Sequence, residues 1–217
     1  MDCLKEMKSI WECKAEARGI LRGNWNGSFT LTLVFLLIVG AVSLGDKVPV
    51  FLGAHKAVTA GFAVLFTLLS FLVVNPMFVG YQNAYRLLCE KGERNLGENA
   101  RRIAFGRYFH NVVGFFLMTV AIVGWTLLLI VPGIVKFFAY AFAPYLLAER
   151  PELTPVEAIR LSDRMMKGHK WALCKLYLSF FGWILLGCLS AGIGFIWIQP
   201  YITTSVSVFY LDIRNSA

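Results

Sequence analysis

Two amide side chains within long uncharged runs are the first candidates for binding chemistry. Asn75 precedes Pro76, and Gln199 precedes Pro200. A proline inside a helix leaves a backbone carbonyl without its usual partner, and a nearby amide can bond to that carbonyl or to another helix. Packing between helices is therefore the simpler interpretation of Asn75 and Gln199. The functional interpretation is a ligand-binding cavity near mid-membrane, lined by these two residues and built from broken helices.

Residues typical of enzymes are scattered along the chain. The histidines are His55, His110 and His169, and no HExxH, GxSxG, Walker A or EF-hand pattern occurs. The five cysteines form no CxxC pair. Lys136 and Glu149 are about 20 Å apart along an ideal helix, too far to pair within it. We therefore predict no catalytic residues, no metal site and no cofactor, and we expect that the protein is not an enzyme.

Basic side chains in two polar segments are candidates for contact with anionic lipid headgroups. The second segment opens with Thr154, Pro155, Val156 and Glu157, which form a capping box with proline at the first helical position. This pattern predicts an amphipathic helix from about residue 155 to 167. The candidate headgroup ligands are Arg101, Arg102, Arg160, Arg164 and Lys167.

The composition indicates the environment in which these residues act. Of the 217 residues, 58% are hydrophobic and only 16% are charged, and the mean hydropathy is +0.64. Residues 57–85, 111–135 and 176–211 contain no Asp, Glu, Lys or Arg. Because a membrane span needs roughly 20 apolar residues, this pattern excludes disorder and argues against a water-soluble domain. The run 176–211 is long enough for a hairpin of two spans.

The distribution of cations predicts the orientation. The six predicted spans place 18 of the 21 Lys and Arg residues on one side, leaving Lys47, Lys56 and Lys136 on the other. Short cytoplasmic loops carry the cationic excess, so both termini should be cytoplasmic. This asymmetry also accounts for the net charge of +8, and we expect no nucleic-acid partner.

The predicted fold is an all-α integral membrane domain of six transmembrane helices, arranged as three hairpin repeats. In each repeat a glycine (Gly23, Gly106 or Gly168) is expected to end a cytoplasmic helix in a left-handed conformation, followed by an aromatic anchor and, later, a proline. The domain is divided into an interfacial amphipathic helix (1–22), hairpins (25–88, 108–149 and 171–212), a cytoplasmic basic segment (89–107) and a cytoplasmic amphipathic helix (150–170). The anchors are Trp25, Tyr108 and Trp171, and the kinks and turns are Pro76, Pro132, Gly133, Pro144 and Pro200.

Several segments carry a family resemblance. RGILRGNW (18–25), VPGI (131–134), APYLLAE (143–149) and MMKGHKW (165–171) resemble the bacterial domain of unknown function 975 family. The Pro-Gly-Ile turn also resembles, more distantly, the membrane domain fused to some glycerophosphodiester phosphodiesterases, although Lys136 stands where that pattern has Arg and no phosphodiesterase domain is present. The resemblance implies a polytopic bacterial membrane protein and supplies no activity.

The favoured interpretation is a non-enzymatic, multi-pass module of the bacterial cytoplasmic membrane that interacts with lipid or protein. Its expected partners are anionic lipid headgroups at the cytoplasmic face, with a protein partner or a second copy of the chain as further options. A small-molecule transporter, or the substrate-binding subunit of one, is the first alternative, supported by the repeats and the proline-broken spans. A membrane-embedded enzyme acting on lipid is the second.

Overall fold

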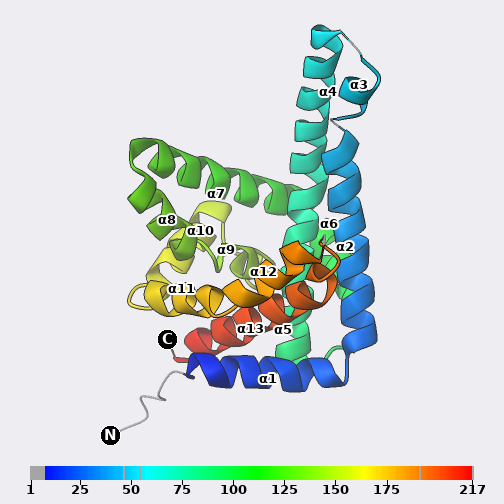
Figure 1. Cartoon of the computed structure of the whole chain (residues 1–217). Helices are drawn as coiled ribbons and strands as arrows, with labels where there is room; N and C mark the ends of the chain where they lie inside the picture. The colour runs from blue at the N-terminus through cyan, green and yellow to red at the C-terminus, as the bar shows by residue number, and fades with distance from the viewer. Residues whose placement is uncertain (1–7, 46, 54, 191, 217) are drawn as a thin grey trace, which may run out of the picture.

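A computed structural model describes residues 8–45, 47–53, 55–190 and 192–216, and within these ranges every regular element is a helix (Figure 1). The all-α prediction is confirmed for this part of the chain. The elements in order are α1 (Ile10–Arg22), α2 (Trp25–Gly45), α3 (Val48–Phe51), α4 (Lys56–Leu69), the π-helix η1 (Ser70–Val74), α5 (Asn75–Lys91), α6 (Leu96–Gly106), α7 (Tyr108–Leu128), α8 (Ile130–Ala139), α9 (Ala143–Glu149), α10 (Pro155–Met165), α11 (Lys170–Leu178), α12 (Phe181–Leu189) and α13 (Phe195–Ser216).

Five helical stretches of the described chain are long and apolar enough to cross a membrane. They are Trp25–Gly45, Lys56–Lys91, Tyr108–Leu128, Ile130–Glu149 and Lys170–Leu189. The sixth predicted span corresponds to α13, which is not among the five. This helix buries hydroxyl side chains from Thr203 to Ser207 and the carboxylate residue Asp212 in the protein core. The three-hairpin repeat and the cytoplasmic termini remain predictions.

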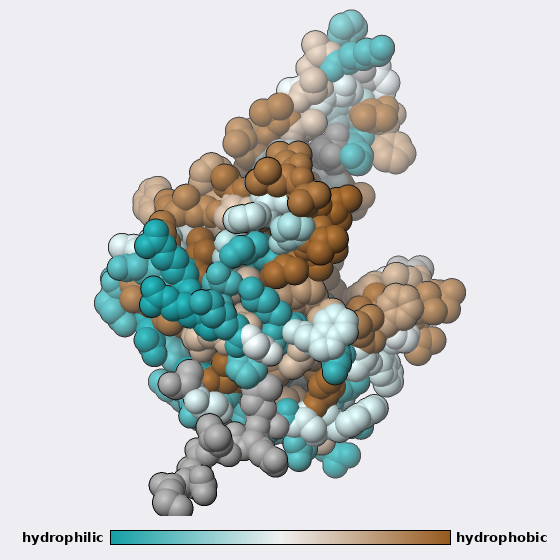
Figure 2. Space-filling view, turned by 90° about the vertical axis from the view of Figure 1, so that its left-hand side faces the viewer, coloured by the Kyte–Doolittle hydropathy of each residue, from teal (hydrophilic) through white to brown (hydrophobic). Residues whose placement is uncertain are grey.

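The long helices do not form a parallel bundle. In Figure 1, α2 and α4 run side by side and their α3 end projects beyond the rest of the molecule, α7 extends sideways from the α4–α5 helix, and α1 and α13 lie together at the opposite end. Large hydrophobic side chains remain exposed on α2, α4, α7, α8 and α12. Figure 2 shows hydrophobic residues gathered on the projecting parts of one face and hydrophilic residues over much of its body. Such exposed apolar faces suit contact with lipid tails.

Two buried clusters hold these helices together. One lies around α9 and α13, where the rings of Tyr145 and Tyr210 stack with centroids 4.8 Å apart. The other lies between α2, α5 and α6, where Phe35 stacks on Tyr81, also at 4.8 Å. Behind it, Gly80 lets α5 pack closely on α6, since a Cβ atom at this position would lie 2.2 Å from a backbone oxygen of α6.

Pro76 is followed by a regular helix and preceded by an irregular one. The proline cannot donate a hydrogen bond to Leu72 four residues earlier, and the five residues of η1 adopt π-helical geometry just before α5. The Leu72 carbonyl instead accepts a hydrogen bond of 2.7 Å from the Tyr108 hydroxyl. Tyr108, predicted only as an interface anchor, therefore also pairs a carbonyl that the proline leaves free.

The turn predicted at Pro132 and Gly133 lies three residues earlier. Leu129 is extended (φ −159°, ψ 136°) and separates α7 from α8, so the prediction that Pro132 ends a helix is wrong. Pro132 lies in the first turn of α8, where a missing N–H costs nothing. Gly133 is buried and brings the two helices together, because a Cβ there would lie 2.3 Å from the Thr126 hydroxyl.

The other two predicted proline positions behave differently. Pro144 lies in the first turn of α9, after a break at residues 140–142 that divides the candidate span Ile130–Glu149 into two helices. Pro200 lies inside α13, which continues through it. Its carbonyl accepts a hydrogen bond of 2.7 Å from the Thr204 hydroxyl. A kink was predicted at each of these prolines. Pro144 instead lies at the start of a helix, and Pro200 lies inside a helix that continues through it.

The predicted glycine ends are correct at one position of three. Gly168 has a φ of +83° after α10. Gly23 has a φ of −92°, and Gly106 is the last residue of α6 without a positive φ, so these two predictions are wrong. The left-handed residue that closes the α5–α6 turn is Gly92, with a φ of +66°.

Helix α1 packs on the protein more than the sequence suggested. It begins after a capping box formed by Ser9 and Glu12, and its buried residues include Lys14 and Leu21. Trp11 is 73% exposed, although the helix packs against α13. The first part of the predicted amphipathic helix, with Leu4 and Met7, lies outside the described residues.

Candidate functional site

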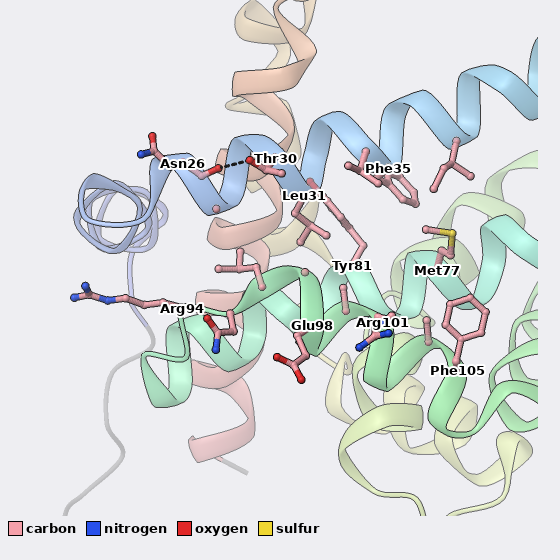
Figure 3. A pocket seen from close by; sticks show the side chains of 18 residues that line it. Asn26, Thr30, Leu31, Phe35, Met77, Tyr81, Arg94, Glu98, Arg101 and Phe105 are labelled. Atoms are coloured by element: carbon pink, nitrogen blue, oxygen red, sulfur yellow. Dashed lines mark hydrogen bonds between the residues drawn. The ribbon is translucent and has the colours of Figure 1, made fainter.

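A groove of about 870 Å³ lies between α2, α5 and α6 (Figure 3). Its apolar walls include Leu31 and Phe35 from α2, Met77 and Tyr81 from α5, and Phe105 from α6. Figure 3 shows that these side chains gather toward one end, where Phe35, Met77 and Phe105 lie close to one another. The groove therefore offers a long apolar surface to a ligand.

The opposite end of the groove is polar. Asn26, Arg94 and Glu98 lie there, and Arg101 lies between this end and Phe105 (Figure 3). Arg94 and Arg101 are exposed on α6 and the turn before it. Glu98 offsets one of these two positive charges, so the rim keeps an excess of one cation.

Hydrogen bonds between the walls fix the shape of the groove. The Thr32 hydroxyl lies 3.1 Å from the hydroxyls of both Tyr81 and Tyr85, and Tyr85 donates to the Ser28 carbonyl at 3.2 Å. These contacts join α2 to α5 in the buried layer behind the groove. Because buried hydroxyls need partners, the network favours one relative position of the two helices.

Sequence reasoning identified only Arg101 among the residues of this groove. Its neighbour Arg102 instead donates a hydrogen bond of 3.2 Å to the Asn99 side chain and lies 4.0 Å from Glu93. The missed signal is the spacing of four residues between Asn26 and Thr30 and between Leu31 and Phe35, which places each pair on adjoining turns of α2.

The remaining predicted headgroup ligands lie on another helix. Arg160 and Arg164 are exposed on α10, and Lys167 is exposed just after it. None of the three lines the groove. The predicted capping box is confirmed, with Thr154 and Glu157 exchanging their side-chain bonds to backbone N–H groups. Whether these cations bind headgroups stays a prediction.

The packing of α10 corrects one part of the predicted topology. Lys136 of α8 lies 3.1 Å from Asp163 of α10, and Lys170 contacts the other oxygen of the same carboxylate at 3.1 Å. Burial raises the pKa of Asp163, but the hydrogen bonds from the two lysines outweigh it and hold the pKa below its ordinary value. The expectation that Lys136 and segment 150–170 lie on opposite sides is therefore wrong.

The two amide candidates lie in different surroundings. Asn75 lines a cavity of about 350 Å³ together with Ser43, Thr67 and Ser70, beside η1. Gln199 is half-buried on α13, and its backbone carbonyl accepts a hydrogen bond from Thr203 at 2.9 Å. It is not among the residues that line the Asn75 cavity.

The two tryptophan anchors are accessible at helix starts. Trp25 is the first residue of α2 and is 37% exposed. Trp171 is the second residue of α11 and is 64% exposed, with the Lys175 ammonium 6.0 Å from its ring centroid. Both positions suit contact with lipid headgroups.

A cluster of ionic side chains joins α5, α9 and α13. Glu149 accepts hydrogen bonds from Tyr210 at 2.5 Å and from Arg214 at 2.6 Å, and lies 3.7 Å from Arg86. Glu90 completes the cluster, 2.6 Å from Arg86 and 2.9 Å from Arg214. Sequence reasoning made no pairing for Glu149 and Arg214, because their partners are distant along the chain.

The described residues contain no group of three or more His, Cys, Asp and Glu side chains that could hold a metal ion. The four described cysteines, Cys13, Cys89, Cys174 and Cys188, are free thiols. Burial raises the pKa of the Cys13 thiol to about 11, so this thiol stays protonated near neutral pH.

A comparison with known protein families identifies the family of this chain. The sequence model of the family described as "Protein of unknown function (DUF975)" matches residues 64–217. The chain belongs to this family. No curated protein and no solved structure matches the chain. The DUF975 match includes α5 and α6, which form two walls of the groove, and confirms the resemblance predicted from the sequence; the distant relation to phosphodiesterase membrane domains remains a prediction.

Proposed function

We propose that this DUF975 protein is a non-enzymatic, multi-pass module of the bacterial cytoplasmic membrane that binds a membrane lipid in the groove between α2, α5 and α6. The groove itself is the observation that carries this proposal. It joins an apolar channel lined by Phe35, Met77 and Phe105 to a polar rim with two arginines. A lipid has the same division between an acyl chain and a headgroup.

The size of the groove supports this assignment. Its volume of about 870 Å³ lies within the range of roughly 300–1,000 Å³ found for small-molecule sites. An acyl chain would lie against Leu31, Phe35 and Met77, while the phosphate of an anionic headgroup would accept charge-assisted hydrogen bonds from Arg101. Arg94 would add a second contact at the outer end.

The experiment is native mass spectrometry of the full chain released from membranes of phosphatidylcholine with a minor fraction of phosphatidylglycerol. Arg101→Gln should lower the occupancy of the groove about tenfold, seen as one phosphatidylglycerol fewer bound per chain, since one good ionic contact contributes roughly 1.4 kcal/mol or more. Arg102→Gln is the matched control, because Arg102 is bonded to Asn99 and does not line the groove. Thr30→Trp, which adds a large side chain to the wall, should also reduce retention. Equal retention by all four proteins would refute the proposal.

Transport is the second candidate function, and the cavity beside η1 favours it. Ser43, Thr67, Ser70 and Asn75 bring polar groups together next to a π-helical segment. Such segments and intramembrane polar groups often mark functional sites. The test is thermal stabilisation of the solubilised chain by a panel of small amino acids and sugars. A solute that stabilises the wild type and Gln199→Leu but not Asn75→Leu would support transport, whereas stabilisation that persists in Asn75→Leu would contradict it.

A further inference from the structure

A second pocket, separate from the groove, is built largely from tryptophan. It has a volume of about 360 Å³ and lies where α1, the start of α2, α12 and α13 meet. Four of the six tryptophans of the chain line it, together with Tyr201. The four are Trp11, Trp25, Trp183 and Trp197. Since they come from four helices, their convergence is a property of the fold and not of local sequence.

The aromatic walls are held in place from behind. Trp197 packs against Phe29 with ring centroids 5.7 Å apart, and Tyr201 packs edge-on against Phe180 at 5.0 Å. Trp183 and Trp197 are nevertheless half-exposed. Tryptophans of a membrane-interface belt are expected around the whole circumference of a protein. Here four of the six tryptophans surround one pocket, an arrangement that an interface belt alone does not predict.

The pocket is positively charged. Lys14 and Arg18 are among its eight lining residues, which include no Asp or Glu. The Lys14 ammonium donates to the carbonyl and the hydroxyl of Ser179, both at 3.2 Å, and lies 4.2 Å from the Phe180 ring centroid. Arg18 is exposed and donates its Nε–H to the Lys14 carbonyl at 3.4 Å. Lys14 is therefore fixed in the wall of the pocket, and Arg18 is exposed to solvent at its edge.

We infer that this pocket binds the headgroup of an anionic phospholipid whose headgroup is a polyol, such as phosphatidylglycerol. The phosphate would pair with Arg18 and lie near Lys14, and the C–H faces of the polyol would pack against the tryptophan rings. A choline headgroup also suits aromatic rings, but its fixed positive charge would meet two cations without a compensating acid. The site thus selects by charge as well as by shape.

The place of the pocket in the fold agrees with a headgroup ligand. Trp25 is the first residue of the first candidate span, so this part of the pocket lies at the entrance to the apolar region. Headgroups occupy that depth in a bilayer, where tryptophan side chains are enriched. The groove between α2, α5 and α6 has different lining residues, so the two sites can be occupied independently.

The test uses quenching of tryptophan fluorescence in the full chain, reconstituted in phosphatidylcholine nanodiscs. Phosphatidylglycerol with dibrominated acyl chains is titrated in, and phosphatidylcholine with the same chains is the comparison lipid. We expect stronger quenching by the phosphatidylglycerol at equal mole fraction. Trp183→Phe and Trp197→Phe should each remove part of the quenched signal.

Charge variants separate this site from the groove. Arg18→Gln should raise the mole fraction needed for half-maximal quenching about tenfold. Arg22→Gln on the same helix and Arg101→Gln in the groove should leave it unchanged, because neither residue lines the tryptophan pocket. Circular dichroism of each variant verifies that the helices form. A loss shared by Arg101→Gln and Arg18→Gln would mean one common surface and overturn the assignment of a separate site.

Three further results would overturn the inference. The first is equal quenching by the two brominated lipids, and the second is a response of Arg22→Gln equal to that of Arg18→Gln. The third is full competition by water-soluble glycerol 3-phosphate at the concentration of the lipid, which would identify a free phosphate ester as the ligand.

Discussion

Glu149 should contribute strongly to stability, because its side chain forms ionic contacts that join α9 to α5 and α13. Its carboxylate accepts hydrogen bonds from Tyr210 and Arg214 and lies 3.7 Å from Arg86. The Glu149, Arg214 and Arg86 side chains are only 18%, 20% and 7% exposed. Glu149→Gln keeps the shape of the side chain and an acceptor for Tyr210, but it leaves Glu90 as the single carboxylate beside the two arginines in this cluster.

The expected loss follows from burial. Removing one partner of a fully buried ion pair costs about 3–5 kcal/mol, whereas an exposed pair is worth about 0–1 kcal/mol. The Glu149 cluster lies between these limits and nearer the first, so we expect a loss of about 2–3 kcal/mol. For a chain of this size that corresponds to a fall of roughly 5–10 °C in Tm.

The assay is thermal unfolding of the detergent-solubilised chain, followed by circular dichroism. Glu93→Gln is the matched control, since Glu93 lies 4.0 Å from an Arg102 side chain that is 67% exposed. It should lower Tm by no more than about 2–3 °C. An Arg214→Gln variant and the double variant complete a cycle, in which the two losses should not add. A Tm for Glu149→Gln equal to that of the control would refute the reasoning.

Three other changes test the packing and the charges. Gly80→Ala should destabilise the chain by about 1–3 kcal/mol in the same unfolding assay, because its Cβ would lie 2.2 Å from the Ala100 carbonyl oxygen, whereas Gly97→Ala should be neutral or stabilising. Tyr108→Phe should cost about 0.5–1.5 kcal/mol, because it removes the hydroxyl that donates to the Leu72 carbonyl, and an unchanged Tm would contradict a stabilising role of this bond. Asp163, whose pKa is below its ordinary value of 3.8, should stabilise the chain fully above that value and lose its contribution as the pH falls through the lower, folded pKa. The Tm difference between wild type and Asp163→Asn should accordingly be constant near neutral pH and shrink in acid; a constant difference down to pH values of about 2 would contradict this account.

Some local features of the structure were predicted from the sequence, and others were not. The capping box at Thr154 and Glu157 and the helical fold follow from spacing and composition, because each depends on residues within a few positions of one another. The break at Leu129 could not be predicted in this way. No proline or glycine marks that residue, and its position depends on how Gly133 packs against Thr126 of the preceding helix.

Binding surfaces were predicted less completely than elements. Arg101 was identified from its charge, but the groove beside it also needs α2, whose residues are more than 60 positions earlier in the sequence. The tryptophan pocket is similar, since Trp25 was identified as an anchor without the three tryptophans that join it. Long-range convergence is fixed by the packing of the core, which composition and periodicity do not specify.

The ion pair between Lys136 and Asp163 changes the interpretation of the charge asymmetry without weakening it. Lys136 was one of three cations assigned to the side opposite segment 150–170, and its contact with Asp163 at 3.1 Å removes it from that side. With this correction, the predicted topology places 19 of the 21 Lys and Arg residues on one side. The two that remain, Lys47 and Lys56, flank α3 at the end of the α2–α4 hairpin that projects farthest in Figure 1.

The charge distribution and the shape of the first hairpin, α2 and α4, are accordingly both consistent with a complete crossing of the membrane. The stretch Ile130–Glu149 is long and apolar enough to span, yet it is broken at residues 140–142. Ser162 of α10 secures this break, donating to the Ala139 carbonyl at 2.7 Å and accepting from the Phe142 N–H at 3.2 Å. A helix bonded in this way to a polar amphipathic segment cannot lie wholly in lipid, because α10 carries exposed arginines along its length. The second hairpin is therefore expected to enter the membrane with the exposed apolar turn between α7 and α8, around Leu129, and to reach the polar side by Lys136.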